Sequence, residues 1–156
     1  MNADDVVKML KEARVGEALE AAGKVEDRRG MASRLTEFAG ALDYLKGRHV
    51  LAEVLLKKSL TLDPGNPVTH YNIGVLYTNP PQLEEDESKL GKAELAFRNA
   101  LKLDPGFHEA RYNLALLLYF TGRVDEAVAE YGRITAAVGD DRRFRELGMM
   151  LLDAGR

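Results

Sequence analysis

The string Leu-x-Leu-Asp-Pro-Gly occurs twice in this chain, as LTLDPG at 60–65 and as LKLDPG at 101–106. Proline disfavours helical backbone in the residue before it, so each string predicts the end of a helix. A helix ending that recurs along the chain indicates a series of similar units. Such arrays usually act by presenting an extended surface, and the repeat therefore favours a binding protein over a single enzyme core.

The spacing of apolar residues predicts helices along almost the whole chain, and strand patterns are nearly absent. Steps of three or four residues place side chains on one face of a helix. One such stripe consists of Leu35, Phe38, Ala39, Leu42 and Leu45. Gly-Arg pairs at 47–48, 122–123 and 155–156 stand where one helix should end, because glycine suits the left-handed residue just past a helix.

Three segments and a final half segment resemble the tetratricopeptide repeat. In that unit of about 34 residues, a first helix carries Trp-x2-Leu-Gly-x2-Tyr and a second carries Ala-x3-Phe before a proline. The clearest match consists of His70, Ile73, Gly74, Tyr77, Ala93 and Phe97. The other matches are Arg111, Leu114, Ala115, Leu118, Ala127 and Tyr131; Thr36, Ala39, Gly40, Ala52 and Leu56; and Phe144, Leu147, Gly148 and Leu151. The resemblance covers about residues 33 to 156.

The resemblance implies an all-α fold, a right-handed α-solenoid of antiparallel helix pairs with about three repeats. We expect the repeats at 33–66, 67–107 and 108–141. Residues 142–156 are expected to form a C-terminal half repeat or capping helix. Residues 1–32 predict two N-terminal helices, which form either a degenerate repeat or a cap.

The second predicted repeat is longer than the others. Pro64 and Pro105 lie 41 residues apart, about seven more than one repeat, and the extra residues fall at about 79–88 between the two helices. This insertion contains four consecutive acids at 84–87. A solvated loop extension is the simplest interpretation, and a contact arm at the edge of a groove is the alternative. Adjacent acids cannot all face one ion, so no metal site is predicted.

Composition and motifs argue against catalysis and against nucleic-acid binding. The formal net charge is -3, and no basic stripe suits a nucleic acid or a lipid surface. The chain lacks cysteine, which removes thiolate chemistry, and it lacks a phosphate loop, a zinc motif and a nucleophile elbow. The histidines His49, His70 and His108 are expected to start helices or to pack. We therefore predict no enzyme activity and no cofactor.

The N-terminal sequence MNADDVVKMLKEAR has acids where a signal peptide needs bases. The apolar stretch at 114–120 is too short to span a bilayer. We expect a cytoplasmic protein that does not insert into membranes.

The resemblance also implies where a partner binds. In tetratricopeptide proteins the first helix of each unit lines a concave face on which partner peptides lie, which here places that face on helices at about 34–46, 68–79 and 109–121. Helical spacing directs mainly aromatic, amide and apolar side chains toward it. They are Arg34, Glu37, Ala41 and Tyr44; Tyr71, Asn72, Val75 and Thr78; and Tyr112, Asn113, Leu116, Tyr119 and Phe120. We expect a protein or peptide ligand, held as an extended peptide or as a partner helix.

The dipeptide Tyr-Asn occurs in two of these helices, at 71–72 and at 112–113. An asparagine side chain offers both a donor and an acceptor, so a row of asparagines can hold an extended peptide backbone. Such asparagine ladders are known in the family. The alternative for Asn72 and Asn113 is a purely local hydrogen bond. The tyrosines likewise either form binding hot spots or pack within the protein.

The resemblance argues against one ligand class. Tetratricopeptide co-chaperones grip the C-terminal carboxylate of heat-shock proteins through Lys and Asn in one repeat, Asn in the next, and Lys and Arg in a third. The corresponding residues here are Glu37, Ala41, Asn72, Glu109 and Asn113, and only Asn72 matches. The acids would repel a carboxylate.

Two further functions stay open from the sequence. The half repeat ends with two methionines and two leucines at 149–152, and methionine suits adaptable contacts. Residues 144–154 are therefore either a solvated cap or a docking face for another copy, which would make the protein a self-assembling scaffold. Small all-α proteins of about three tetratricopeptide units also serve bacterial secretion systems as chaperones, and this chain resembles them in size and repeat count.

Overall fold

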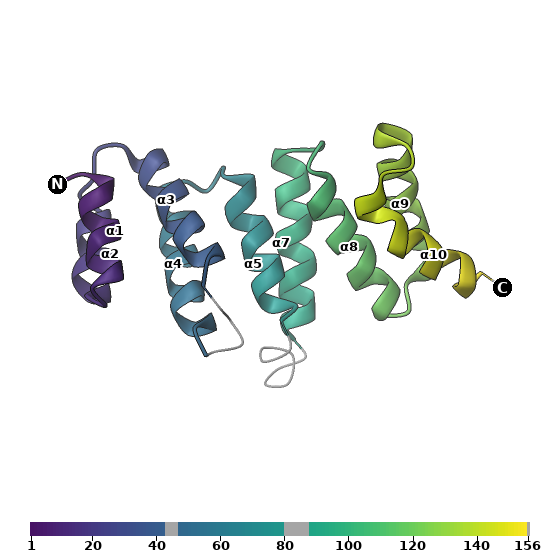
Figure 1. Cartoon of the computed structure of the whole chain (residues 1–156), viewed down its shortest axis with the longest axis horizontal. Coiled ribbons are helices and arrows are strands. Elements are labelled where there is room, and N and C mark those ends of the chain that lie inside the picture. Colours follow the sequence, from purple (N-terminus) through teal and green to yellow (C-terminus); the bar gives the residue numbers. More distant parts are fainter. Residues whose placement is uncertain (43–46, 80–87, 156) are drawn as a thin grey trace.

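The computed structural model describes residues 1–42, 47–79 and 88–155. Within these ranges the chain is helical with no strand, and the helices stand side by side in an elongated row (Figure 1). The helices are α1 (Ala3–Lys11), α2 (Val15–Ala22), α3 (Arg28–Gly40), α4 (His49–Leu62), α5 (Pro67–Tyr77), α7 (Lys89–Leu103), α8 (His108–Phe120), α9 (Val124–Val138) and α10 (Arg145–Ala154). The prediction of an all-α solenoid of helix pairs is confirmed.

The two copies of the repeated string fold into the same turn. Helices α4 and α7 both end at the second leucine of the string, and the aspartate that follows has an extended backbone, as the next proline requires. The Asp63 side chain accepts a hydrogen bond from the Gly65 backbone N–H at 3.1 Å, and Asp104 accepts one from Gly106 at 3.0 Å. Repeated sequence therefore gives repeated local structure.

The glycines predicted to follow helix ends differ in backbone conformation. Gly47 and Gly122 have φ of 76° and 80°, in the left-handed region that glycine favours. Gly155 follows α10 with φ of -79°, so α10 ends without a left-handed residue.

The N-terminal helices form an antiparallel pair, α1 and α2, and α1 packs against α3 (Figure 1). Helix α3 begins at Arg28, inside the range 1–32 that the sequence predicts for the N-terminal helices. Asp27 caps this start, because its side chain accepts a hydrogen bond from the Gly30 backbone N–H at 2.9 Å. The first helix of the first repeat is therefore longer at its N-terminus than the repeat pattern predicts.

The first helices of successive pairs contact one another along one side of the row. Helix α3 packs against both α1 and α5, and α10 packs against α8. The second helices α2, α4, α7 and α9 complete the pairs. No helix in the described ranges is both long and apolar enough to cross a membrane.

Neighbouring helices approach closely where one carries a glycine and the other an aromatic ring. A Cβ added at Gly74 in α5 would overlap the ring of Phe97 in α7, which is fully buried. A Cβ added at Gly148 in α10 would likewise overlap the phenol of Tyr131 in α9. The aromatic side chain thus fills the space that the missing side chain leaves.

A buried cluster of hydroxyls joins α3, α4 and α5. Thr36 Oγ1 lies 2.9 Å from Ser59 Oγ and 2.7 Å from Thr69 Oγ1, and Ser59 donates to the Ala32 carbonyl at 2.9 Å. Buried hydroxyls cost free energy unless they are hydrogen-bonded, and here each one has partners. The cluster therefore fixes three helices relative to one another.

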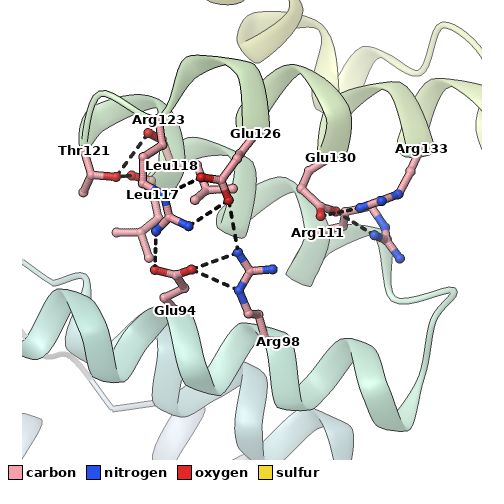
Figure 2. A network of polar contacts seen from close by, with 10 residues as sticks. All are labelled: Glu94, Arg98, Arg111, Leu117, Leu118, Thr121, Arg123, Glu126, Glu130 and Arg133. Atoms are coloured by element: carbon pink, nitrogen blue, oxygen red, sulfur yellow. Dashed lines mark hydrogen bonds and ion pairs between the residues drawn. The ribbon is translucent and has the colours of Figure 1, made fainter.

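Charged side chains connect α7 and α9 (Figure 2). Glu94 accepts hydrogen bonds from Arg98 at 2.9 Å and from Arg123 at 2.7 Å, and Arg123 also donates to Glu126 at 2.8 Å. Partial burial raises the pKa of Glu94, but the hydrogen bonds from Arg123 and Arg98 outweigh it and hold that pKa below its usual value. These pairs are partly exposed, so each stabilises the fold only slightly.

A second ion pair in the same view is more deeply buried (Figure 2). Arg111 in α8 donates to Glu130 in α9 at 2.6 Å, and the two side chains are only 14% and 9% exposed. Glu130 also pairs with Arg133 at 2.5 Å, and Arg111 donates to the Pro105 carbonyl at 3.0 Å. Removing one partner of such a pair leaves a buried charge poorly compensated.

Replacing Gly74 with alanine should destabilise the protein by about 1–3 kcal/mol, because the added methyl group overpacks the Phe97 contact. The matched control is Gly132→Ala in α9, where a Cβ would meet nothing within 4 Å. That change should stabilise the helix by up to about 1 kcal/mol. Urea unfolding measures the free energy of unfolding of both variants. If both substitutions changed it by the same amount in the same direction, the contact with Phe97 would not restrict the size of the residue at Gly74.

Replacing Arg111 with leucine should lower the free energy of unfolding by roughly 3 kcal/mol, because Glu130 stays buried with Arg133 alone. Arg98→Leu, in the more exposed network, should cost less than about 1 kcal/mol. Thermal and urea unfolding of both variants give the comparison. An Arg111 variant no less stable than the Arg98 variant would refute a structural role for the buried pair.

Candidate functional site

The predicted site residues lie on α3, α5 and α8, the first helices of three successive pairs. Arg34 and Glu37 are exposed on α3. The half-buried members are Tyr71 and Asn72 with Val75 on α5, and Tyr112, Asn113, Leu116 and Tyr119 on α8. Tyr44 and most of the insertion predicted at 79–88 lie outside the described residues.

Asn72 bridges two neighbouring units. Its side-chain N–H donates to the backbone carbonyl of Thr36 at 3.4 Å, so α5 is tied to α3. Gly40 leaves room for this contact, because a Cβ there would lie 3.1 Å from the Asn72 nitrogen. The local hydrogen bond that the sequence offered as one alternative is therefore present.

Asn113 makes the corresponding bridge one unit further along. Its side-chain N–H donates to the Tyr71 hydroxyl at 3.1 Å, which ties α8 to α5. The Tyr71 ring is held in turn by Phe107, with ring centroids 4.9 Å apart, and by Phe97 at 6.1 Å. Both asparagines of the Tyr-Asn dipeptides thus reach back to the preceding first helix.

Each of these amides keeps hydrogen-bonding capacity after its bridge is made. Within the described residues, neither side-chain oxygen accepts a hydrogen bond, and neither is among the buried polar atoms that lack a partner. Both oxygens therefore reach solvent. The bridge fixes the orientation of each amide, and the oxygen stays available to a ligand N–H.

Each asparagine also lines a hollow. Between α3 and α5 an open cavity of about 210 Å³ is lined by Ser33, Thr36, Glu37, Gly40, Asn66, Val68 and Asn72. A second cavity, of about 270 Å³, is lined by Thr78, Leu90, Asn113, Leu116, Leu117 and Phe120. The first is mainly polar in its side chains and the second mainly apolar, so the two hollows suit different ligand groups.

The site tyrosines have packing partners of their own. The Tyr112 ring lies 5.3 Å from Phe144, and the Tyr119 ring meets Phe120 edge-on at 5.3 Å. Burial raises the pKa of Tyr71 and of Tyr112, and the hydrogen bond from Asn113 lowers that of Tyr71 in part. Each of these rings therefore has an aromatic neighbour and remains only half-buried, so a role in binding stays a prediction.

The charged groups near this face are already paired. Arg34 donates to Asp4 at 2.7 Å and lies 3.5 Å from Glu37. Arg143 pairs with Glu109 at 2.8 Å. Two of the three positions that hold cations in the carboxylate-binding co-chaperones thus hold the acids Glu37 and Glu109 here, and these acids pair with arginines of the same chain.

Sequence reasoning missed Phe107 and the hydroxyl cluster. Phe107 follows the second Asp-Pro-Gly turn and carries the packing of Tyr71. Its only sequence signal is an aromatic residue directly before a predicted helix. The histidines match their expected roles: His49 and His108 are the first residues of α4 and α8, and His70 lies 2.9 Å from the Pro64 carbonyl.

Residues 86–148 match the protein family described as Tetratricopeptide repeat. This part of the chain is similar to the tetratricopeptide repeat. Among curated protein sequences, no match was found. The family is generally an interaction fold without catalysis, and no cluster of His, Cys, Asp and Glu in the described residues could hold a metal ion.

Two solved structures share this fold. The first tetratricopeptide domain of Spaghetti (RPAP3), bound to the HSP90 peptide SRMEEVD, is 20% identical, with a TM-score of 0.64 over 80% of this chain and 98% of that one. A thermophilic tetratricopeptide protein of Thermus thermophilus, TTC0263, is 25% identical, with a TM-score of 0.59 over 94% of this chain and 77% of that one. The first likeness shows the fold alone.

Alkaline pH should destabilise this protein through its half-buried tyrosines. Because burial raises the pKa of Tyr71 in the folded state, its stabilising contribution is fully present below the unfolded value of about 10 and is lost as pH rises through the folded pKa. Between pH of about 8 and about 11, Tyr71→Phe should therefore lose less unfolding free energy than the wild type. Urea unfolding at both pH values tests this, and an equal loss in the two proteins would contradict it.

Proposed function

We propose that this protein is a non-catalytic interaction module that holds an extended peptide of a partner protein on the face formed by α3, α5 and α8. A partner helix on the same face is the alternative ligand geometry. The observation that carries the proposal is the pair Asn72 and Asn113. Each amide is oriented by a bond to the preceding helix, has an oxygen open to solvent, and lines a hollow.

The geometry suits a peptide backbone. An extended peptide presents N–H groups at regular intervals, and each Asn oxygen can accept one of them. Because the amides are already fixed by their bridges, little side-chain entropy is lost when the ligand binds. Backbone recognition alone is tolerant of sequence, so side-chain selectivity would come from the hollows beside Asn72 and Asn113.

The hollow beside Asn113 favours a ligand with an apolar side chain, and the charges on this face do not favour a grip on a C-terminal carboxylate. Leu116 and Phe120 line the cavity beside Asn113, and Phe120 is largely exposed. The HSP90 peptide belongs to the solved neighbour. Here Glu37 and Glu109 stand where a carboxylate would need cations, and the nearby Arg34 and Arg143 are already paired with these acids.

An affinity pull-down from native cell extract tests the proposal, comparing the wild type with an Asn72→Ala/Asn113→Ala/Tyr112→Ala variant. The control is Asn99→Ala on α7, in the other row of helices. We expect the control to capture the same partner as the wild type. The triple variant should bind it at least about tenfold more weakly, since each lost hydrogen bond costs roughly 1 kcal/mol.

Circular dichroism must show unchanged helicity in each variant, because Asn72 and Asn113 also link helices. A partner retained by the triple variant would end the proposal. It would move the binding site to the insertion, to the second helices or to the C-terminal helix.

A further inference from the structure

The hollow between α3 and α5 is small and mainly polar. Its volume of about 210 Å³ is below the roughly 300–1,000 Å³ of pockets that hold small-molecule ligands, so it suits one long side chain. Among the described residues that line it, Glu37 is the only charged one. A ligand group that enters this hollow therefore meets an acid and no base.

Several polar side chains around the hollow are already bonded within the protein. The Asn66 side-chain oxygen accepts from the backbone N–H of Val68 at 3.0 Å, and its amide donates to Ser33 Oγ at 3.5 Å. The Thr36 hydroxyl belongs to the buried hydroxyl cluster. These bonds hold the walls of the hollow and use much of the hydrogen-bonding capacity of the three side chains.

Two acceptor groups beside these walls are open. The guanidinium of Arg34 lies 3.5 Å from the Glu37 carboxylate but donates its hydrogen bond to Asp4 at 2.7 Å. No described residue donates a hydrogen bond to Glu37. The Asn72 side-chain oxygen is open as well, because only its N–H forms the bridge to Thr36. Two carboxylates share one guanidinium here, which leaves a net negative charge.

The end of α3 adds to this negative potential. Helix α3 ends at Gly40, which lines the hollow, and the last turn of the helix carries no basic side chain. The C-terminal end of a helix has a partial negative charge that favours a nearby cation. A Cβ at Gly40 would lie 3.1 Å from the Asn72 nitrogen, so the glycine lets that amide lie close to the helix end. A carboxylate, an amide oxygen and a helix C-terminus thus border one hollow.

An apolar wall accompanies these acceptors. Val68 lines the hollow and is 45% exposed. Lysine and arginine pack their aliphatic stems along apolar surface while the charged end reaches polar groups. A metal ion is a poorer occupant, because the hollow offers a single carboxylate and no group of His, Cys, Asp and Glu in the described residues could hold one. The hollow therefore suits an organic cation with an aliphatic stem.

We propose that the hollow between α3 and α5 holds a lysine or arginine side chain of the bound peptide, with the charged end near Glu37 and the Asn72 oxygen. This inference rests on the proposed function, which places an extended peptide on the face of α3, α5 and α8. The hollow beside Asn113 is mainly apolar by contrast. The face then selects peptide segments that carry both a basic and an apolar side chain, and does not accept every backbone equally.

Selection from a random peptide library displayed on phage tests this inference. The library is panned on the wild-type chain and, in parallel, on the Asn72→Ala/Asn113→Ala/Tyr112→Ala variant. Peptides enriched on the wild type alone should share a lysine or arginine at a constant separation from an apolar residue. Enriched peptides without a shared basic residue would overturn the inference and leave the proposed function standing. Enrichment of no peptide on the wild type would count against both.

Charge reversal then locates the basic side chain. An enriched peptide and its counterpart with glutamate at the basic position are titrated into the protein by fluorescence polarisation. The wild type should bind the basic peptide at least about tenfold more tightly. Glu37→Gln should reduce this preference, and Glu37→Lys should reverse it, because unlike charges then meet only in the glutamate peptide. Tight binding of that peptide by Glu37→Lys also shows that the variant is folded.

The matched control is Glu20→Lys on α2, in the other row of helices. Glu20 and Glu37 are 73% and 69% exposed, each lies near one base of its own helix, and both substitutions change the net charge equally. The control should keep the wild-type preference. An equal effect of both reversals would indicate a long-range charge effect and overturn the inference. An unchanged preference in Glu37→Lys would also overturn it, since the basic side chain then lies elsewhere.

Discussion

The rest of this structure depends on the close approach of neighbouring helices. At Gly74 the missing side chain admits the Phe97 ring, and at Gly148 it admits the phenol of Tyr131. Each pair buries its apolar face only against its neighbours, so stability accumulates from local interfaces along the row. The hydroxyl cluster then fixes α5 relative to α3 and α4, and the buried Arg111–Glu130 pair links the two helices of one unit.

The sequence predicted the parts of the fold that depend on local spacing. The repeated Asp-Pro-Gly strings located two helix ends correctly, and the tetratricopeptide pattern includes both Gly74 and Phe97, whose contact the structure shows. It could not predict contacts between residues far apart in the chain. Thr36 bonds to Thr69, and Asn113 to Tyr71, 42 positions away. Periodicity assigns a side chain to a helix face but does not say which group lies opposite.

The same limit applies at the candidate site. Helical spacing and the family resemblance assign the candidate residues to α3, α5 and α8, but they do not say which groups the asparagines meet. The structure shows that one side-chain N–H of Asn72 and of Asn113 forms a local bridge, and that the side-chain oxygen stays open. The bridge does not use that oxygen, so the peptide-holding role stays a prediction beside it.

We propose that the open amide oxygens of Asn72 and Asn113 receive a peptide backbone. An NMR titration of the isotope-labelled protein with the binding segment of its captured partner tests this through the side-chain amide resonances of the asparagines. The signals of Asn72 and Asn113 should shift in a saturable way while that of Asn99 does not. Saturable binding that leaves both amides unperturbed and shifts residues elsewhere would contradict it.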